Sequence, residues 1–151
     1  MKKDISPIYS IERLEQILNT IPQLLRAIDE NEMQFKSSPD KWSKKQILGH
    51  LIDSASINHH RFVRGQFEDV PEISYDQDKW NDHSYYQQID TKQIIDLWTV
   101  YNRQILEITK RIPSGHWQRM IRVKDDRFTL EFILSDYVHH MEHHLRQVVN
   151  Y

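Results

Sequence analysis

Four histidines lie within six positions near the end of the chain, in the sequence HHMEHH at residues 139–144. They form two pairs spaced by four residues, His139 with His143 and His140 with His144. Residues four apart on a helix lie one turn above each other, so either pair could bind one metal ion. On a helical wheel, His140 and His144 lie at the edge of the apolar arc, and the other pair faces solvent. We therefore expect His140 and His144 to be the ligands of a metal site inside the protein.

A catalytic metal site needs a third protein ligand, which must come from another part of the chain. Five histidines lie outside the cluster, namely His50, His59, His60, His83 and His116. His50 lies at the flank of the apolar arc of its predicted helix, as His140 does in the last helix. His59 lies near the other edge, His60 points away, and the remaining two fall in predicted loops. We predict His50 as the third ligand; the alternative is a buried histidine with a purely structural role.

Several other chemistries lack the residues that they need. No HExxH motif, no Glu-x-x-His pair, no Gly-x-Ser-x-Gly, no P-loop and no GxGxxG is present. The absence of cysteine excludes disulfides, thiolate metal sites and a cysteine nucleophile. A net charge of -2 gives no basic surplus for nucleic acid. No apolar stretch is long enough for a membrane span or a signal peptide, so we expect a cytoplasmic protein with no membrane partner.

Four amphipathic helices are predicted to position these histidines within one domain, residues 1–151. Apolar residues spaced by three and four indicate helices over about 11–28, 44–65, 90–112 and from 130 to the C-terminus. Only 3 glycines and 5 prolines occur, which favours long helices over an all-β fold. We predict an all-α protein, an antiparallel four-helix bundle with a long polar and aromatic loop at 66–89.

Local signals mark the ends of these helices. Ser43 with Gln46, and Asp90 with Gln93, are typical of capping boxes, and Thr129 is a predicted N-cap of the last helix. Pro22 is expected to kink or break the first helix, because proline lacks the N–H that continues it. Residues 116–128 are consistent with either a short strand or irregular structure.

The order and spacing of several short motifs resemble the DinB/YfiT-like superfamily from about residue 10 to residue 148. The motifs are Trp42-Ser43, Ile47-Leu48-Gly49-His50-Leu51, Asn58, Arg61-Phe62, Tyr75-Asp76-Gln77-Asp78-Lys79-Trp80, and His140-x-x-x-His144-Leu145-x-Gln147. The resemblance implies a bundle with one divalent metal ion held by three histidines. On this chain they are His50, His140 and His144, although His139 and His143 leave the register open. It also implies a homodimer.

The same resemblance implies an enzyme, and we weigh three hypotheses for its function. Members include thiol S-transferases that use bacillithiol, mycothiol or glutathione, a maleylpyruvate isomerase type, and proteins described as metal-dependent hydrolases. Our first hypothesis is a thiol S-transferase that activates a small thiol as a metal-bound thiolate against an electrophilic substrate. The second is a hydrolase that uses metal-bound hydroxide, and the third is a non-catalytic bundle for dimerisation or partner binding. The metal is expected to be zinc or nickel, with iron or manganese as alternatives.

Other residues have weaker expected roles around this site. Asp136 lies one turn before His140 and could accept its ring N–H. Arg61 could hold an anionic cosubstrate or form a surface ion pair. An aromatic and acidic set in the long loop could form a lid over the site or cover the end of the bundle: Tyr75, Asp78, Trp80, Asp82 and Tyr85.

Overall fold

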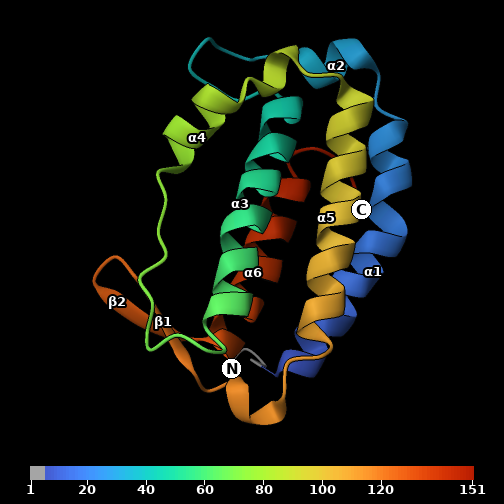
Figure 1. Cartoon of the computed structure of the whole chain (residues 1–151). Helices are drawn as coiled ribbons and strands as arrows, with labels where there is room; N and C mark the ends of the chain where they lie inside the picture. The colour runs from blue at the N-terminus through green and yellow to red at the C-terminus, as the bar shows by residue number, and fades with distance from the viewer. Residues whose placement is uncertain (1–5) are drawn as a thin grey trace.

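A computed structural model describes residues 6–151. Its body consists of four long helices: α1 (Pro7–Arg26), α3 (Lys44–Arg64), α5 (Thr91–Thr109) and α6 (Leu130–Leu145) (Figure 1). Shorter elements connect them: α2 (Glu30–Gln34), α4 (Gln77–Ser84), the 3-10 turns η1 (Tyr86–Gln88) and η2 (Ser114–His116), and the strands β1 (Met120–Val123) and β2 (Asp126–Thr129). The predicted four-helix bundle is confirmed, with the antiparallel β1–β2 hairpin as a minor addition.

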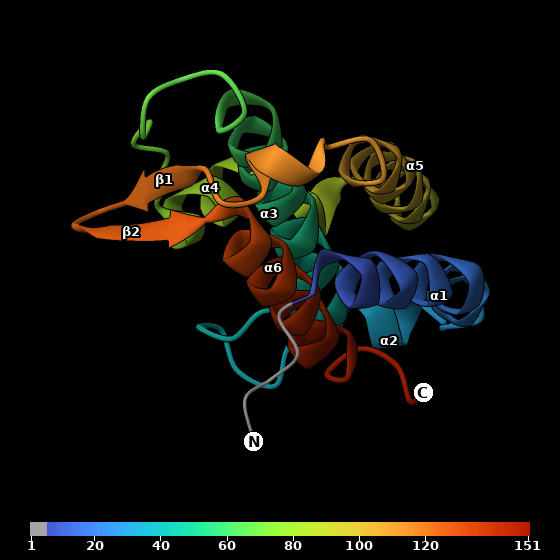
Figure 2. The same ribbon diagram turned by 90° about the horizontal axis from the view of Figure 1, so that it is seen from below.

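Each long helix packs against two others, in the cyclic order α1, α5, α3, α6 (Figure 2). The neighbours α3 and α6 run in opposite directions, as do α1 and α5 (Figure 1). The neighbours α1 and α6 run in the same direction, so the bundle is not antiparallel throughout, whereas the sequence had predicted an antiparallel bundle. The helices α3 and α5 also run in the same direction. This parallel pair arises because the segment 65–90 returns along the length of the bundle before α5 begins. The long connection between the second and third long helices therefore determines the topology.

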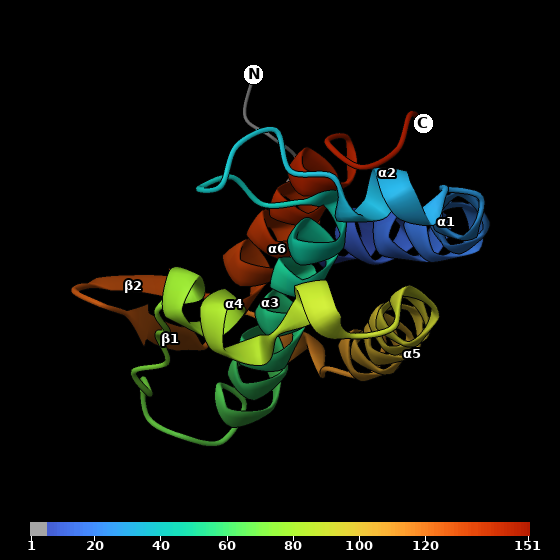
Figure 3. The same cartoon turned by 90° about the horizontal axis from the view of Figure 1, so that it is seen from above.

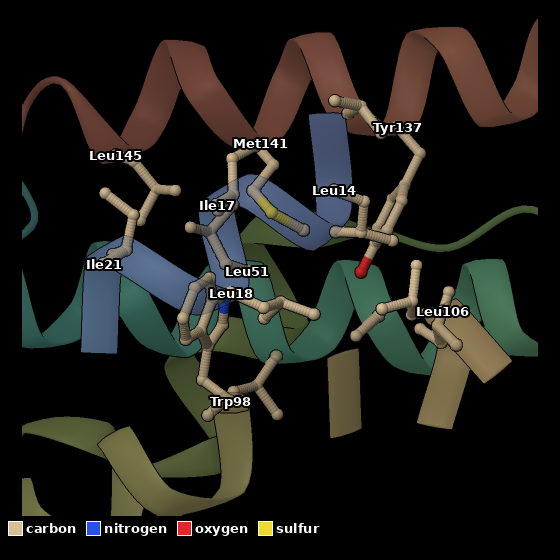
Figure 4. Packing of buried hydrophobic residues seen from close by; sticks show 14 of the residues in the cluster. Leu14, Ile17, Leu18, Ile21, Leu51, Trp98, Leu106, Tyr137, Met141 and Leu145 are labelled. Carbon is tan, nitrogen blue, oxygen red and sulfur yellow. The ribbon is translucent and has the colours of Figure 1, made fainter. Parts of the chain in front are cut away.

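The core lies between the four long helices and is built from apolar side chains of each of them (Figure 4). The labelled members include Leu14 and Leu18 of α1, Leu51 of α3, Trp98 of α5 and Met141 of α6, all buried. Fully burying one such large side chain contributes roughly 1.5–3 kcal/mol. The histidine positions on α3 and α6 thus lie on helices that this core holds firmly in place.

The expectation at Pro22 was a kink or a broken turn; α1 runs through Pro22 without a break, so the turn there is not broken. Because proline has no N–H, the carbonyl of Leu18 one turn earlier loses its normal helical donor. The guanidinium of Arg103 on α5 donates a hydrogen bond to this carbonyl, with 3.3 Å between Nη2 and the oxygen. A side chain from the neighbouring helix therefore compensates for the missing backbone hydrogen bond.

The predicted helix starts are largely confirmed. The Ser43–Gln46 capping box is reciprocal, with Gln46 N donating to Ser43 Oγ at 3.1 Å and Ser43 N donating to Gln46 Oε1 at 2.9 Å. Asp90 accepts from Gln93 N at 3.3 Å, and Thr129 accepts from Phe132 N at 3.1 Å. The last helix ends earlier than expected, at Leu145, and the chain continues in turns.

Two segments differ from a simple loop. Within 66–89, α4 follows the N-cap Asp76 and stops before the C-cap Tyr85, which has the left-handed φ of 58°. Its eight residues are almost all polar, so they lack the regular spacing of apolar residues from which a helix is predicted. The β1–β2 hairpin occupies residues 120–129, which confirms the strand alternative for the segment 116–128. No helix within residues 6–151 is long and apolar enough to cross a membrane.

Candidate metal centre

Three histidines from two neighbouring helices converge in the interior of the bundle. His50 lies on α3, and His140 and His144 lie one turn apart on α6. One ring nitrogen from each lies within 4.8 Å of the others. Among the residues that the structure describes, no other His, Cys, Asp or Glu side chain joins this group. Three ligands with no fourth leave one coordination position open, which is the pattern of catalytic rather than structural sites.

The spacing of the nitrogens suits a metal ion. The Nε2 atoms of His50 and His140 lie 3.2 Å apart. Metal–nitrogen bonds of about 2.0–2.1 Å at tetrahedral angles place two ligand nitrogens roughly 3.3 Å apart. Without an ion, one of these nitrogens must carry a hydrogen and donate it to the other. With an ion, both would direct lone pairs at it without moving far.

His50 is the most enclosed of the three, with only 1% of its surface exposed. Its ring packs against Trp42, with 4.9 Å between centroids, and against the rings of His140 at 5.1 Å and His144 at 4.8 Å. Its Nδ1 atom is buried and has no hydrogen-bond partner within residues 6–151. His140 and His144 are only half-buried, so solvent or a substrate would reach the centre from their side.

Gln147 fixes the orientation of the His144 ring. The Nδ1 atom of His144 lies 3.0 Å from Oε1 of Gln147. An amide oxygen can only accept, so Nδ1 carries the hydrogen and Nε2 keeps its lone pair. Metal-binding histidines are commonly held in this way through their second nitrogen. The end of α6 at Leu145 places Gln147 in the following turn, where it can fold back onto the ring.

The environment keeps the three imidazoles neutral. Burial first, and then the neighbouring His140 and His144, lower the pKa of His50 to about 3. Burial and the nearby His144 and His143 lower the pKa of His140 to about 4. The pKa of His144 is also lowered, mainly by burial. Neutral imidazole is the form that binds a metal ion, so all three rings are ready as ligands at neutral pH.

Acidification should therefore destabilise the metal-free protein through His50 and His140. Their pKa values are lowered on folding from 6.5, so the stabilisation is complete above that pH and is lost as the pH falls through 6.5 towards 4. Between about pH 7 and about pH 5, the free energy of unfolding should fall about 1–3 kcal/mol more than in a His50→Gln/His140→Gln variant.

Urea unfolding of both chelator-treated chains at the two pH values measures this difference. Burial raises the pKa of Asp53 to about 6, which has the opposite effect on stability, but Asp53 is common to both chains and cancels. Equal changes in the two chains would contradict neutral, buried imidazoles.

The other histidines do not join this group, although 5.1 Å separates the ring centroids of His143 and His144. His139 and His143 are exposed on α6, and His60 is exposed on α3. The Nδ1 atoms of the rest have other partners: His59 contacts Tyr101 Oη at 2.9 Å, His83 contacts the Lys79 carbonyl at 2.7 Å, and His116 contacts Gln66 Oε1 at 3.1 Å. The structure thus brings together the three histidines that the wheel selected.

The weaker expectations have different outcomes. Asp136 is exposed, and within residues 6–151 no hydrogen bond joins it to His140, so the expected hydrogen bond is not formed. Arg61 forms no ion pair in the part of the chain that the structure describes. Its guanidinium instead donates twice to the carbonyl of Ile73, at 3.1 and 2.9 Å, and once to Asn58 Oδ1 at 3.3 Å. Arg61 therefore anchors the returning segment to α3.

The segment expected as a lid is held against α3 (Figure 3). Asn81 of α4 is buried and donates to the carbonyl of Gln46 at 2.9 Å. Tyr75 and Trp80 pack edge to face, with 5.8 Å between centroids. Asp78, Asp82 and Tyr85 are exposed. This part of the chain covers the N-terminal half of α3, the half that carries His50.

A buried Asp53–Tyr86 pair next to the centre was not anticipated from the sequence. Tyr86 of η1 donates its hydroxyl to Oδ1 of Asp53 at 2.5 Å. The ring passes so close to Gly49 that a Cβ there would lie 2.1 Å from Tyr86 Cδ2. Gly49 belongs to the family motif around His50, but no local signal in the sequence points to Tyr86, which lies 33 positions beyond Asp53.

The family model of the DinB superfamily matches residues 13–148 of this chain. The chain belongs to the DinB superfamily. This membership confirms the resemblance drawn from Trp42, the His50 motif and the terminal His140-x-x-x-His144 motif.

Two comparisons place this DinB-superfamily chain beside a protein of Bacillus subtilis. The chain is 22% identical over 141 residues to YfiT of strain 168, covering 91% of this chain and 79% of YfiT. It also matches a solved structure of YfiT with a TM-score of 0.86 and 20% identity, covering 98% of this chain and 86% of that one. YfiT is described there as "a probable metal-dependent hydrolase with an unusual four-helix bundle topology". The structural match shows that the two chains share a fold.

Proposed function

We propose that this chain is a metal-dependent enzyme whose ion is held by His50, His140 and His144. The observation that carries the proposal is the convergence of these three neutral imidazoles, within 4.8 Å of one another, with no fourth side-chain ligand among residues 6–151. Zinc and nickel are the ions that we propose, because imidazole nitrogen suits both, and iron or manganese are the alternatives.

The surrounding residues would prepare the site for chemistry. Neutral ligands leave the positive charge of an ion undiminished, and Gln147 holds the lone pair of His144 in the required direction. When bound, a divalent ion in such a site lowers the pKa of a coordinated water or thiol and polarises a carbonyl group. The half-buried His140 and His144 mark the side from which a substrate would enter.

Hydrolysis is the reaction that we place first, because the similar protein YfiT is described as a metal-dependent hydrolase. The sequence alone had favoured thiol transfer through the family resemblance. Thiol transfer remains the second candidate: the chain contains no cysteine, so the thiol would have to come from a small cosubstrate that reacts with an electrophile.

A homodimer is also proposed from the resemblance, and sedimentation of the purified chain would test it.

Two assays on the same preparation distinguish these reactions. Zinc-loaded or nickel-loaded protein is tested on an activated p-nitrophenyl ester without any thiol, and on a small thiol with a chromogenic aryl halide. We expect metal-dependent ester hydrolysis that falls by about 100-fold or more in a His50→Ala variant. Turnover only in the presence of the thiol would assign the transferase instead.

A negative result is equally informative. If the loaded wild-type chain is no faster than His50→Ala in both assays, the proposal of an enzyme acting on either class is wrong. The chain would then be better explained as a non-catalytic bundle that binds a partner.

A further inference from the structure

Two buried polar atoms that lack a hydrogen-bond partner in the described part of the chain lie three residues apart on α3. They are Nδ1 of His50 and Oδ2 of Asp53, and their residues are 1% and 2% exposed. Residues three apart on a helix are neighbours on its surface, with about 5–6 Å between their Cβ atoms. One of these atoms can donate a hydrogen bond and the other can accept one. The two unsatisfied groups are therefore complementary in chemistry and adjacent in position.

The orientation of the His50 ring determines which nitrogen needs an acceptor. Its Nε2 atom faces the Nε2 atom of His140 at 3.2 Å, on the side where the three histidines converge. If Nε2 binds an ion, the hydrogen of the neutral ring must lie on Nδ1. A buried N–H without an acceptor is unfavourable, because the group has lost its hydrogen bond to water and gained none in exchange. His144 avoids this cost through Gln147, and His50 has no such partner.

Asp53 is already held in place on its other side. Tyr86 donates to its Oδ1 atom at 2.5 Å, and the Tyr86 ring is fixed by its close passage over Gly49. This hydrogen bond leaves Oδ2 as the oxygen that lacks a donor. A carboxylate that accepts from the second nitrogen of a metal-binding histidine orients the ring and makes it a stronger ligand.

We propose that Asp53 is a positioning residue for the metal centre: in the loaded protein, Nδ1–H of His50 donates to Oδ2 of Asp53. The hydroxyl of Tyr86, the carboxylate of Asp53 and the ring of His50 then form one continuous chain of hydrogen bonds. This inference rests on the proposed metal site, and Asp53 itself does not touch the ion or the substrate.

Tyr75 is the rival donor for Oδ2. Burial is the first cause that raises the pKa of Tyr75 to about 12, and the charge of Asp53 is the second. No hydrogen bond joins Tyr75 to Asp53 in the described part of the chain. A Tyr75→Phe variant removes this donor without changing the shape of the ring, so it serves as the matched control.

Zinc affinity tests the proposal in the full-length chain, by competition with a chromophoric chelator. In Asp53→Asn the amide oxygen can still accept from Tyr86, but an NH2 group then faces His50. We expect Asp53→Asn to bind zinc about 10–100-fold more weakly than the wild type, and Tyr75→Phe to bind it within about threefold. Unfolding curves of both variants check that the bundle is intact.

A spectroscopic measurement on the wild type and the same two variants gives an independent test. In the zinc-loaded chain labelled with ¹⁵N, the proposal predicts a slowly exchanging, downfield N–H proton on Nδ1 of His50. This proton signal should be lost or shifted upfield in Asp53→Asn and unchanged in Tyr75→Phe. A change in folding stability alone would not move it selectively.

The outcomes separate this inference from the proposed function. If wild-type protein fails to bind zinc, or His50→Ala binds it equally well, the metal site itself is wrong and this inference falls with it. If His50→Ala loses zinc but Asp53→Asn keeps wild-type affinity, the metal site stands and the role of Asp53 is overturned. A His50 Nδ1 proton that exchanges rapidly in the loaded wild type would overturn that role as well.

Discussion

A His50→Ala variant is expected to contain less than about one tenth of the metal found in the wild-type chain, which should hold about one equivalent. His50 is the sole ligand candidate that α3 contributes to the converging group, so its removal leaves the two α6 histidines alone. Two imidazoles on one helix do not make the three-ligand site that holds an ion tightly. Elemental analysis of untagged protein, purified without chelators, measures the difference.

Matched variants make this result specific. His60→Ala lies on the same helix but alters an exposed side chain, and it should keep the wild-type metal content. His144→Ala should lose metal as His50→Ala does, because it removes a ligand from the other helix. Removing the buried His50 ring beside Trp42 leaves a small cavity, so a circular dichroism spectrum must show that the bundle remains folded. Unchanged metal in folded His50→Ala would contradict the assignment of His50 as a ligand.

A Gly49→Ala substitution is expected to destabilise the chain by about 2–3 kcal/mol, because a methyl group has no room there. The added Cβ would lie 2.1 to 2.6 Å from three carbon atoms of the Tyr86 ring. The ring must therefore move, and its hydroxyl would be drawn away from the buried Asp53. Losing the donor to a buried carboxylate adds to the strain.

Gly115→Ala is the matched control for this substitution. A Cβ at that position meets no atom within 4 Å, so the free energy of unfolding should change by less than about 0.5 kcal/mol. Urea unfolding of the wild type and both variants measures the two effects. A Gly49→Ala chain as stable as Gly115→Ala would show that Tyr86 does not pack over α3 as described.

The parts of the fold that local sequence determines were predictable. Helical spacing of apolar residues located the four long helices, and the Ser43 and Thr129 caps located two of their starts. The same wheel argument separated His140 and His144 from their exposed neighbours, since the face of a helix that is buried follows from its apolar residues. Short elements such as α4 were missed because eight residues carry too little pattern.

Contacts between distant segments could not be predicted. The hydrogen bond from Tyr86 to Asp53 and the donation by Arg103 to the Leu18 carbonyl each depend on the packing of separate elements. Gln147 belongs to the terminal motif that contains His140 and His144, but its hydrogen bond to His144 depends on where α6 ends. The parallel course of α3 and α5 likewise follows from the path of the connecting segment rather than from either helix alone.

Anomalous diffraction from crystals of the zinc-loaded chain tests the central claim most directly. The account predicts a single strong zinc peak about 2.0–2.1 Å from Nε2 of His50, Nε2 of His140 and Nε2 of His144, with a solvent molecule or another small ligand in the fourth position. A peak bound instead by His139 and His143, or no peak between α3 and α6, would contradict the three-histidine centre on which the proposed function rests.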